Sequence, residues 1–178
     1  MATSANKRIG ILGGTFNPVH NGHLYIAEQA IKKFRLDRLI FVPVYMPPHK
    51  KISDRIAIKD RLNMLRLAAR KNKKFSISNY EIKQKGKSYS IKTARFFRRK
   101  YGSKTEFFFI IGRDSLRGLK KWKDIKELRK IVKFACFPRT KGDISSTEIR
   151  RRLKKGDPID NLVPREVSKY IEENKLYR

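Results

Sequence analysis

Two histidines placed three residues apart are the side chains most suggestive of chemistry in this chain. His20 and His23 follow a turn that contains Gly13 and Gly14. Residues at positions i and i+3 share one face of a helix, so both imidazoles can face one point. Glycine lets backbone N–H groups come close to an anion, and a helix N-terminus adds unpaired N–H groups with a partial positive charge. The pattern therefore suits a phosphate group.

The same histidines have two other readings, as a helix cap or as a zinc pair. Zinc is disfavoured because no Cys or carboxylate nearby completes a site, and the only other histidine is His49. The phosphate-binding patterns Gly-x-x-x-x-Gly-Lys-Ser/Thr and Gly-x-Gly-x-x-Gly are both absent. Phosphate binding would thus depend on histidine and on a glycine turn of another kind.

Three later stretches also carry candidate polar groups. Gly112 and Asp114 follow the most apolar run of the chain. An acid at this place suits a ribose diol, but Asp114 fits the role of a helix cap equally well. The segment 145–148 has the pattern of a capping box, and with Arg150 behind it the helix start would also bind an anion. Trp122, the sole tryptophan, is either core or a plate on which a ring stacks.

The elements that must position these residues follow from hydrophobic periodicity. Apolar or alternating runs predict strands at 9–12, 38–43, 75–82, 107–111 and 131–137. Helical spacing or cap residues predict helices from 24 to 34, from Ser53 or Asp54 to about Lys71, from about Ser90 as cap, from Asp124 to Lys130, from Ser145 or Ser146 to Gly156, and after Pro164. This alternation predicts one α/β domain over residues 1–178. Its fold would be a Rossmann-like open parallel sheet with helices on both faces and the site at the carboxyl ends of the strands.

Composition narrows the class of protein. The 178 residues are enough for a real core, the single Cys136 excludes a disulfide framework, and no stretch approaches membrane-spanning length, which indicates a cytoplasmic protein. The net charge of +29 attracts polyanions, but the basic residues are spread through every segment. Nucleic-acid contact is therefore expected only as non-specific electrostatics, and the oligomeric state is not readable from the sequence.

Three motifs carry a resemblance to a known family. The segment from Gly13 through Thr15, Phe16 and Asn17 to His23 resembles the signature of the nucleotidyltransferase superfamily, whose core is His-x-Gly-His. Pro47-Pro48-His49-Lys50 and the stretch from Ile144 to Arg150 make the chain similar to bacterial nicotinate-nucleotide adenylyltransferases. The resemblance implies transfer of AMP from ATP to nicotinate mononucleotide in NAD biosynthesis, with pyrophosphate as leaving group. It also implies Mg²⁺ held through the ATP phosphates and no metal ligands from the protein.

The resemblance also assigns roles to residues. It implies catalytic roles for His20, His23, Lys50 and Arg150. It implies ATP contacts from Gly13, Gly14, Thr15, Phe16, His20, His23, Gly112, Asp114, Ser146, Thr147 and Arg150. It implies contacts with nicotinate mononucleotide from Asn17, Lys50, Tyr89, Ser90, Trp122 and Arg139.

The chain departs from the family pattern at three places. Ser90 replaces a threonine, which conserves a backbone role, and Val44-Tyr45 replaces a polar pair. Only residues 138–143 separate the last strand from the Ile144 motif, where the family usually has a longer segment with a further strand and an Arg-Pro-Gly, of which Arg139 is the nearest equivalent.

Two other functions stay open from the sequence. A sister enzyme such as phosphopantetheine adenylyltransferase shares His-x-Gly-His, but the Pro47–Lys50 motif, the Ser88–Ser90 stretch and Trp122 argue against it. A non-catalytic, basic nucleic-acid-binding protein on the same fold is disfavoured by intact His20, His23 and Arg150.

Overall fold

The centre of the molecule is a five-stranded parallel sheet. The computed structural model describes residues 6–48, 56–138 and 144–178. The strands follow the order β3-β2-β1-β4-β5, and every neighbouring pair is parallel. Their bounds are β1 Arg8–Gly14, β2 Arg38–Pro43, β3 Phe75–Ile77, β4 Glu106–Gly112 and β5 Val132–Phe137. The expected open parallel sheet is confirmed.

After a charged first residue, the inner strands are apolar because both faces of the sheet are covered. In β4, Phe108 and Ile110 belong to one buried cluster, while Phe107, Phe109 and Ile111 belong to the other. A strand alternates its side chains between two faces, so a continuous apolar run is what a doubly covered parallel strand needs. Burial of these side chains on both faces stabilises the sheet, and the sheet positions the site.

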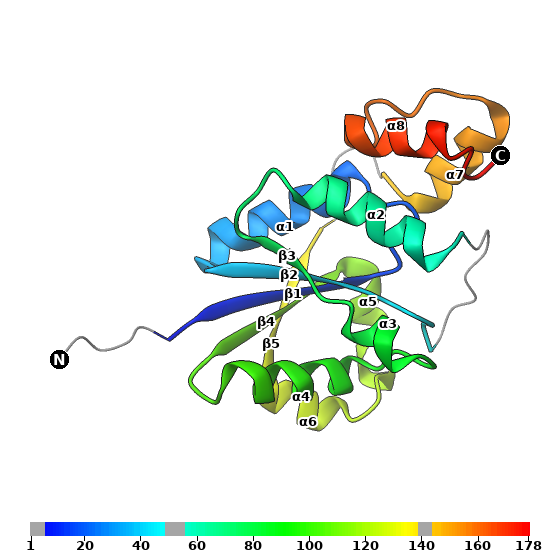
Figure 1. The fold of residues 1–178 in the computed structure, drawn as a ribbon. Helices are drawn as coiled ribbons and strands as arrows, with labels where there is room; N and C mark the ends of the chain where they lie inside the picture. The colour runs from blue at the N-terminus through cyan, green and yellow to red at the C-terminus, as the bar shows by residue number, and fades with distance from the viewer. Residues whose placement is uncertain (1–5, 49–55, 139–143) are drawn as a thin grey trace.

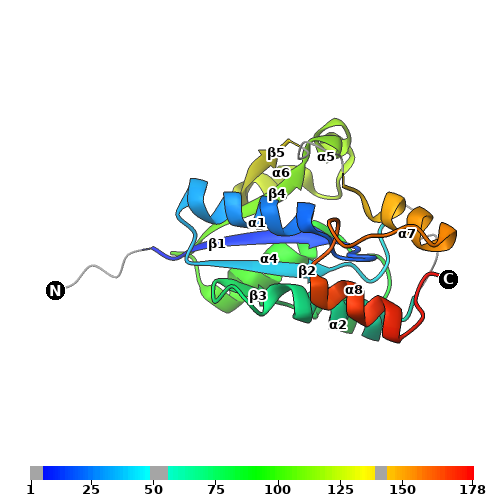
Figure 2. The same ribbon diagram turned by 90° about the horizontal axis from the view of Figure 1, so that it is seen from above.

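Helices cover the two faces of the sheet in two groups (Figure 1). Helices α1 and α2 lie on one face, and α4 and α6 lie on the other. Near the carboxyl ends of β1 and β2, away from the N-terminal end of the chain, lie α7 and α8 (Figure 2). The bounds are α1 Asn21–Phe34, α2 Ile58–Ala69, α3 Tyr80–Gln84, α4 Ser90–Tyr101, α5 Arg113–Gly118, η1 Leu119–Lys121, α6 Ile125–Ile131, α7 Ser146–Lys155 and α8 Arg165–Glu173. None of the helices described here is long and apolar enough to span a membrane.

One predicted strand is wrong in its second half. Residues 80–82 form part of the short helix α3, and β3 already ends at Ile77. The Tyr80 ring stacks on Phe96 of α4 at 4.1 Å, and Thr93 Oγ1 of the same helix donates a hydrogen bond to Glu81. Because these contacts come from a helix later in the chain, local alternation did not reveal them.

Two predicted helix starts also need correction. The helix expected from Ser53 or Asp54 begins at Ile58; residues 49–55 lie outside the described part, but Ile56 and Ala57 are described and are not helical. Ser90 is the first residue of α4 and not its cap, because Tyr89 occupies the N-cap position. By contrast, Ser145 caps α7 and Gly156 ends it with a φ of 76°, as the sequence predicts.

Candidate active site

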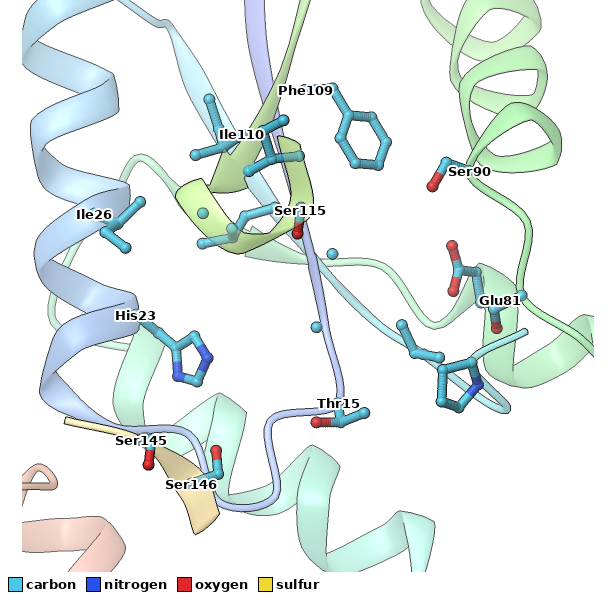
Figure 3. A pocket seen from close by; sticks show the side chains of 18 of the residues that line it. Thr15, His23, Ile26, Glu81, Ser90, Phe109, Ile110, Ser115, Ser145 and Ser146 are labelled. Atoms are coloured by element: carbon cyan, nitrogen blue, oxygen red, sulfur yellow. The ribbon is translucent and has the colours of Figure 1, made fainter. Parts of the chain in front are cut away.

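A cavity of about 700 Å³ opens at the carboxyl ends of β1 and β4 (Figure 3). It brings together twelve of the residues that the sequence singled out: Gly13, Gly14, Thr15, His20, His23, Tyr89, Ser90, Gly112, Trp122, Ser146, Thr147 and Arg150. We call the part around His20, His23, Ser146, Thr147 and Arg150 the histidine end. The part around Glu81, Tyr89, Ser90, Trp122 and Lys123 is the aromatic end.

Five of the selected residues are not seen lining this cavity. Lys50 and Arg139 lie outside the described residues, and Asp114 is described only as a backbone position within α5. Phe16 and Asn17 are 0% and 2% exposed, and both belong to the framework behind the cavity.

The two imidazoles at the histidine end are stacked on each other. Their ring centroids are 3.7 Å apart, and the backbone N–H of His20 donates to Nδ1 of His23 at 3.2 Å. That bond leaves the proton of a neutral His23 on Nε2, the far edge of a ring that points into the cavity (Figure 3). The Nδ1 atom of His20 is buried and has no hydrogen-bond partner among the described residues.

Burial holds both imidazoles in their neutral form. It lowers the pKa of His20 from 6.5 to about 4. The pKa of His23 also lies well below its usual range, first because of burial and second because of the neighbouring His20. An anion that entered the cavity would favour the charged forms and move both pKa values back up. The two imidazoles thus offer neutral N–H donors to a phosphate.

Position 22, between the two histidines, is a glycine for a steric reason. A Cβ atom on Gly22 would lie 3.1 Å from Nδ1 of His20, which is closer than nearly all real contacts of this kind. The His20 ring therefore lies directly over residue 22, and glycine leaves room for it. This contact explains the middle of the His-x-Gly-His pattern in physical terms.

The turn between β1 and α1 is held from behind by polar groups of α7 and of the C-terminal segment. A guanidinium N–H of Arg150 donates to the carbonyl of Asn17 at 2.9 Å, and the Tyr177 hydroxyl donates to the Asn17 side-chain oxygen at 2.8 Å. Ser146 donates to the carbonyl of Pro18 at 2.9 Å. Arg150 is buried and still lines the cavity, so it supports the turn and faces the site.

The N-terminus of α7 adds a second set of donors to the histidine end. The Ser145 side chain accepts a hydrogen bond from the Glu148 backbone N–H at 3.1 Å, so Ser145 caps the helix as expected. The second bond of a capping box is not formed, because the Glu148 carboxylate accepts from Arg151. Ser146 and Thr147 are the first two residues of the helix, and both line the cavity. Two helix N-termini therefore meet around one space, an arrangement that suits a polyphosphate.

The aromatic end is assembled from α4 and from the segment after η1. Trp122 packs edge-on against Phe109 and Phe134, with ring centroids 5.8 and 6.0 Å apart, and also lines the cavity. The Nζ atom of Lys123 lies 4.9 Å from the centroid of the Tyr89 ring. The N-cap residue Tyr89 makes no side-chain cap bond to α4. The first N–H groups of α4 have no partner within the helix.

Sequence reasoning missed two buried polar residues at this site. Glu81 lines the aromatic end, and burial raises its pKa while the Thr93 and Ser88 hydroxyls oppose the rise. Arg61 of α2 donates to the carbonyls of Thr15 and Val44 at 2.8 and 2.9 Å, which ties the segments after β1 and β2 together. Neither residue belongs to a motif. The only signal for Glu81 is an acid placed between Tyr80 and Ile82.

The fold and the site define a nucleotide-binding α/β protein of the nucleotidyltransferase type. The model of the cytidylyltransferase-like family matches residues 11–152. A protein of Shouchella clausii, named "Probable nicotinate-nucleotide adenylyltransferase", is 41% identical over 187 aligned residues, which cover 96% of this chain and 97% of that protein.

Two further comparisons agree. The nicotinate-nucleotide adenylyltransferase of Bacillus subtilis is 37% identical over 96% of this chain and 98% of its own length. A solved structure from Vibrio parahaemolyticus is similar in fold, with a TM-score of 0.82 at 20% identity over 97% of this chain and 96% of the other. The chain belongs to the cytidylyltransferase-like family and, within it, to the nicotinate-nucleotide adenylyltransferases. The resemblance drawn from the three motifs is confirmed.

Proposed function

We propose that residues 1–178 form one domain that transfers the adenylyl group of ATP to nicotinate mononucleotide, giving nicotinate adenine dinucleotide and pyrophosphate. One observation carries the proposal: a single cavity joins a histidine end rich in N–H donors to an aromatic end. The names of the curated relatives from Shouchella clausii and Bacillus subtilis point to the same reaction.

The reaction needs positioning and charge stabilisation more than covalent chemistry. An oxygen of the mononucleotide phosphate attacks the α-phosphorus of ATP, and the bond from that phosphorus to the bridging oxygen of the β-phosphate breaks. Negative charge develops on the oxygens around phosphorus and on the leaving pyrophosphate. Donors that are already in place stabilise such charge without rearranging during the reaction.

The histidine end would supply those donors. The Nε2–H of His23 would bond to a phosphate oxygen, and His20 would lie beside it on the same phosphate. Arg150 and the N-terminus of α7 would neutralise the β- and γ-phosphates. Gly13, at the cavity side of β1, would leave space for the nucleotide, because a Cβ there would meet only the edge of Phe109 at 4.0 Å.

Some proposed roles depend on residues that lie behind the cavity or outside the described part. Lys50 is proposed on the phosphates, Arg139 on the mononucleotide, and Gly112 with Asp114 on the ribose of ATP. Phe16 acts through His23, whose ring it meets edge-on at 5.0 Å. Asn17 acts through the shape of its turn, which Arg150 and Tyr177 hold.

Magnesium is proposed as the partner of the ATP phosphates. No group of three His, Cys, Asp or Glu residues in 6–48, 56–138 and 144–178 forms a possible metal site. Glu81, the one acid among the described lining residues, lies at the end away from the histidines. With so few carboxylates near the histidines in the described part of the chain, a magnesium ion would be bound mainly through phosphate oxygens and water. When bound, the ion would neutralise phosphate charge.

The aromatic end would take the pyridine ring. Trp122 would stack on the ring, and the backbone N–H groups at Ser90 and after Trp122 would bind its carboxylate. The NH₂ of a nicotinamide would face these donors and leave them unpaired, at a cost of roughly 1–3 kcal/mol each. The acid should therefore be the better substrate.

Pyrophosphate release from ATP tests the proposal. Nicotinate mononucleotide, nicotinamide mononucleotide and phosphopantetheine would be offered in turn to the purified protein. We expect release with the first, weaker release with the second and none with the third. Release only with phosphopantetheine would favour the sister enzyme, and no release with any acceptor would reject adenylyl transfer.

A further inference from the structure

Glu81 is a buried carboxyl group that no step of the proposed reaction uses. It is 8% exposed and lies on α3 at the aromatic end, on the same side of the cavity as Ser90 (Figure 3). Its Oε1 accepts a hydrogen bond from Thr93 Oγ1 at 2.5 Å. Its Oε2 is buried, and none of the hydrogen bonds found among the described residues reaches it, although the Ser88 hydroxyl is near enough to lower the pKa of the carboxyl. An unpaired buried oxygen costs free energy, so its presence in a cavity wall points to a ligand.

The surroundings of Glu81 indicate which part of a ligand it would meet. Ser90 and Ile91 begin α4, where the N-cap residue Tyr89 makes no side-chain bond to the backbone N–H groups. The carboxyl of Glu81 and these N–H groups border the same end of the cavity, which Trp122 also lines. A planar substituent on a stacked ring would therefore find N–H donors and the Glu81 carboxyl within the same space.

We propose that Glu81 is a specificity-determining residue that contacts the substituent of the pyridine ring and shares a proton with a ring carboxylate. This inference rests on the proposed function. When the ring carries a carboxylate, a protonated Glu81 donates its O–H to it. When the ring carries an amide, no proton is shared.

Proton balance follows from this contact. Burial already raises the pKa of Glu81, and an incoming carboxylate raises it further because two carboxylates at short range do not both stay charged. A Glu81 that is ionised in the free protein therefore takes one proton from solvent when the acid binds. The amide binds without that uptake.

Other charged groups around this end are few in the described part of the chain. Lys123 and Tyr89 line the same end, and Ser88 and Thr93 contribute hydroxyls. Lys83 of α3 and Lys92 of α4 are exposed. Strand β2, which contacts α3, adds no titratable side chain to the cavity lining. No charged group in this set contributes to the shift of the Glu81 pKa.

Calorimetry with nicotinate mononucleotide in two buffers of different ionisation enthalpy measures the proton directly. For the wild-type protein we expect about one proton taken up per ligand above the pKa of Glu81, and an apparent Kd that rises about tenfold per pH unit. In Glu81→Gln the side chain keeps its size and an oxygen for Thr93, and its NH₂ donates at every pH. Proton uptake and the rise in Kd should both disappear.

Two further variants separate this role from a structural one. Glu127→Gln removes an exposed carboxylate that pairs with Arg95 and should keep the wild-type pH dependence. Thr93→Val removes a donor that lowers the pKa of Glu81, so the onset of proton uptake should move to higher pH. A purely structural Glu81 would change the melting temperature without moving that onset.

The outcomes distinguish failure of this inference from failure of the proposed function. Mononucleotide binding without proton uptake in the wild type, or with the same pH slope in Glu81→Gln, overturns the role of Glu81 and leaves the function standing. No mononucleotide binding at any pH overturns both. If Glu81→Gln does not fold, the shift expected in Thr93→Val decides the question, and an unchanged onset rejects the role.

Discussion

The histidine end and the aromatic end of the cavity are built in different ways. One short segment from Gly13 to His23 supplies both imidazoles of the histidine end, and the N-terminal half of α7 adds Ser146, Thr147 and Arg150. The aromatic end is assembled from Glu81, Ser90 and Trp122, which lie on three different segments of the chain. Recognition of the phosphates therefore starts from one contiguous motif that α7 completes, whereas recognition of the ring depends on tertiary packing throughout.

The two ends also differ in charge when the cavity is empty. Burial keeps His20 and His23 neutral, so these two rings bind an anion first through N–H groups and gain charge afterwards. The aromatic end holds a carboxyl whose pKa burial raises. The protonation state at each end thus depends on the ligand: the histidines respond to a phosphate, and Glu81 responds to the ring substituent. Variants at each end should affect different kinetic constants.

The largest effect is expected from His20→Ala. Loss of a donor to the developing charge should lower kcat about a hundredfold to a thousandfold, with little change in the KM for the mononucleotide. The melting temperature should stay close to wild type, because the His20 carbonyl, which accepts from the N–H groups of His23 and Leu24, is retained. Steady-state kinetics and thermal unfolding measure the two effects. An unfolded variant with normal activity per folded molecule would reverse the assignment.

A second effect concerns how the buried histidines make the stability of the protein depend on pH. The pKa of His20 is about 4 in the folded protein against 6.5 in the unfolded chain, so between these values only the unfolded chain binds the proton. The free energy of unfolding should therefore fall as pH drops from 6.5 to about 4, by up to about 3 kcal/mol. Burial of His23 acts in the same direction. His20→Asn should flatten this part of the profile in urea unfolding, and an unchanged slope would contradict the assignment.

At the aromatic end, Trp122→Ala should raise the KM for the mononucleotide about tenfold and spare the KM for ATP, because stacking on the ring is lost. Trp122→Phe serves as the matched control and should recover most of the affinity. Initial rates with each substrate varied in turn measure both constants. If Trp122→Ala loses affinity for ATP instead, the pyridine ring does not lie at the aromatic end of the cavity.

The smallest effect is expected from salt. A net charge of +29 gathers nucleotides through a long-range field, so the KM for ATP should rise about twofold to threefold as ionic strength increases to physiological values. Initial rates in a series of NaCl concentrations measure this effect. Tight duplex binding that survives such salt, together with no adenylyl transfer, would instead favour a nucleic-acid-binding protein.

Much of the fold was readable because the information is local. The runs at 38–43 and 107–111 are apolar at every position that two covered faces require, and the structure places β2 and β4 there. Residues 80–82 misled because a short stretch that alternates fits a strand and a helix equally well. The choice depends on Phe96 and Thr93, which pack against it from α4.

The candidate site divides in the same way. His20, His23 and Gly22 form a contiguous pattern, and the structure stacks the two rings over the glycine as their spacing suggests. Glu81 and Arg61 gave no such sign, because a lone acid or base in a polar stretch normally faces solvent. Their burial depends on helices that reach the same place from elsewhere in the chain.

The hydrogen bond from Tyr177 to Asn17 links residues 160 positions apart and has a consequence for biosynthesis. A ribosome that has made the first half of the sheet has already released the nucleotide-binding turn, but the tyrosine that supports it is still untranslated. The turn would therefore reach its final form only after Tyr177 has been made. A nascent chain that has not yet reached this residue would have an unfinished pocket.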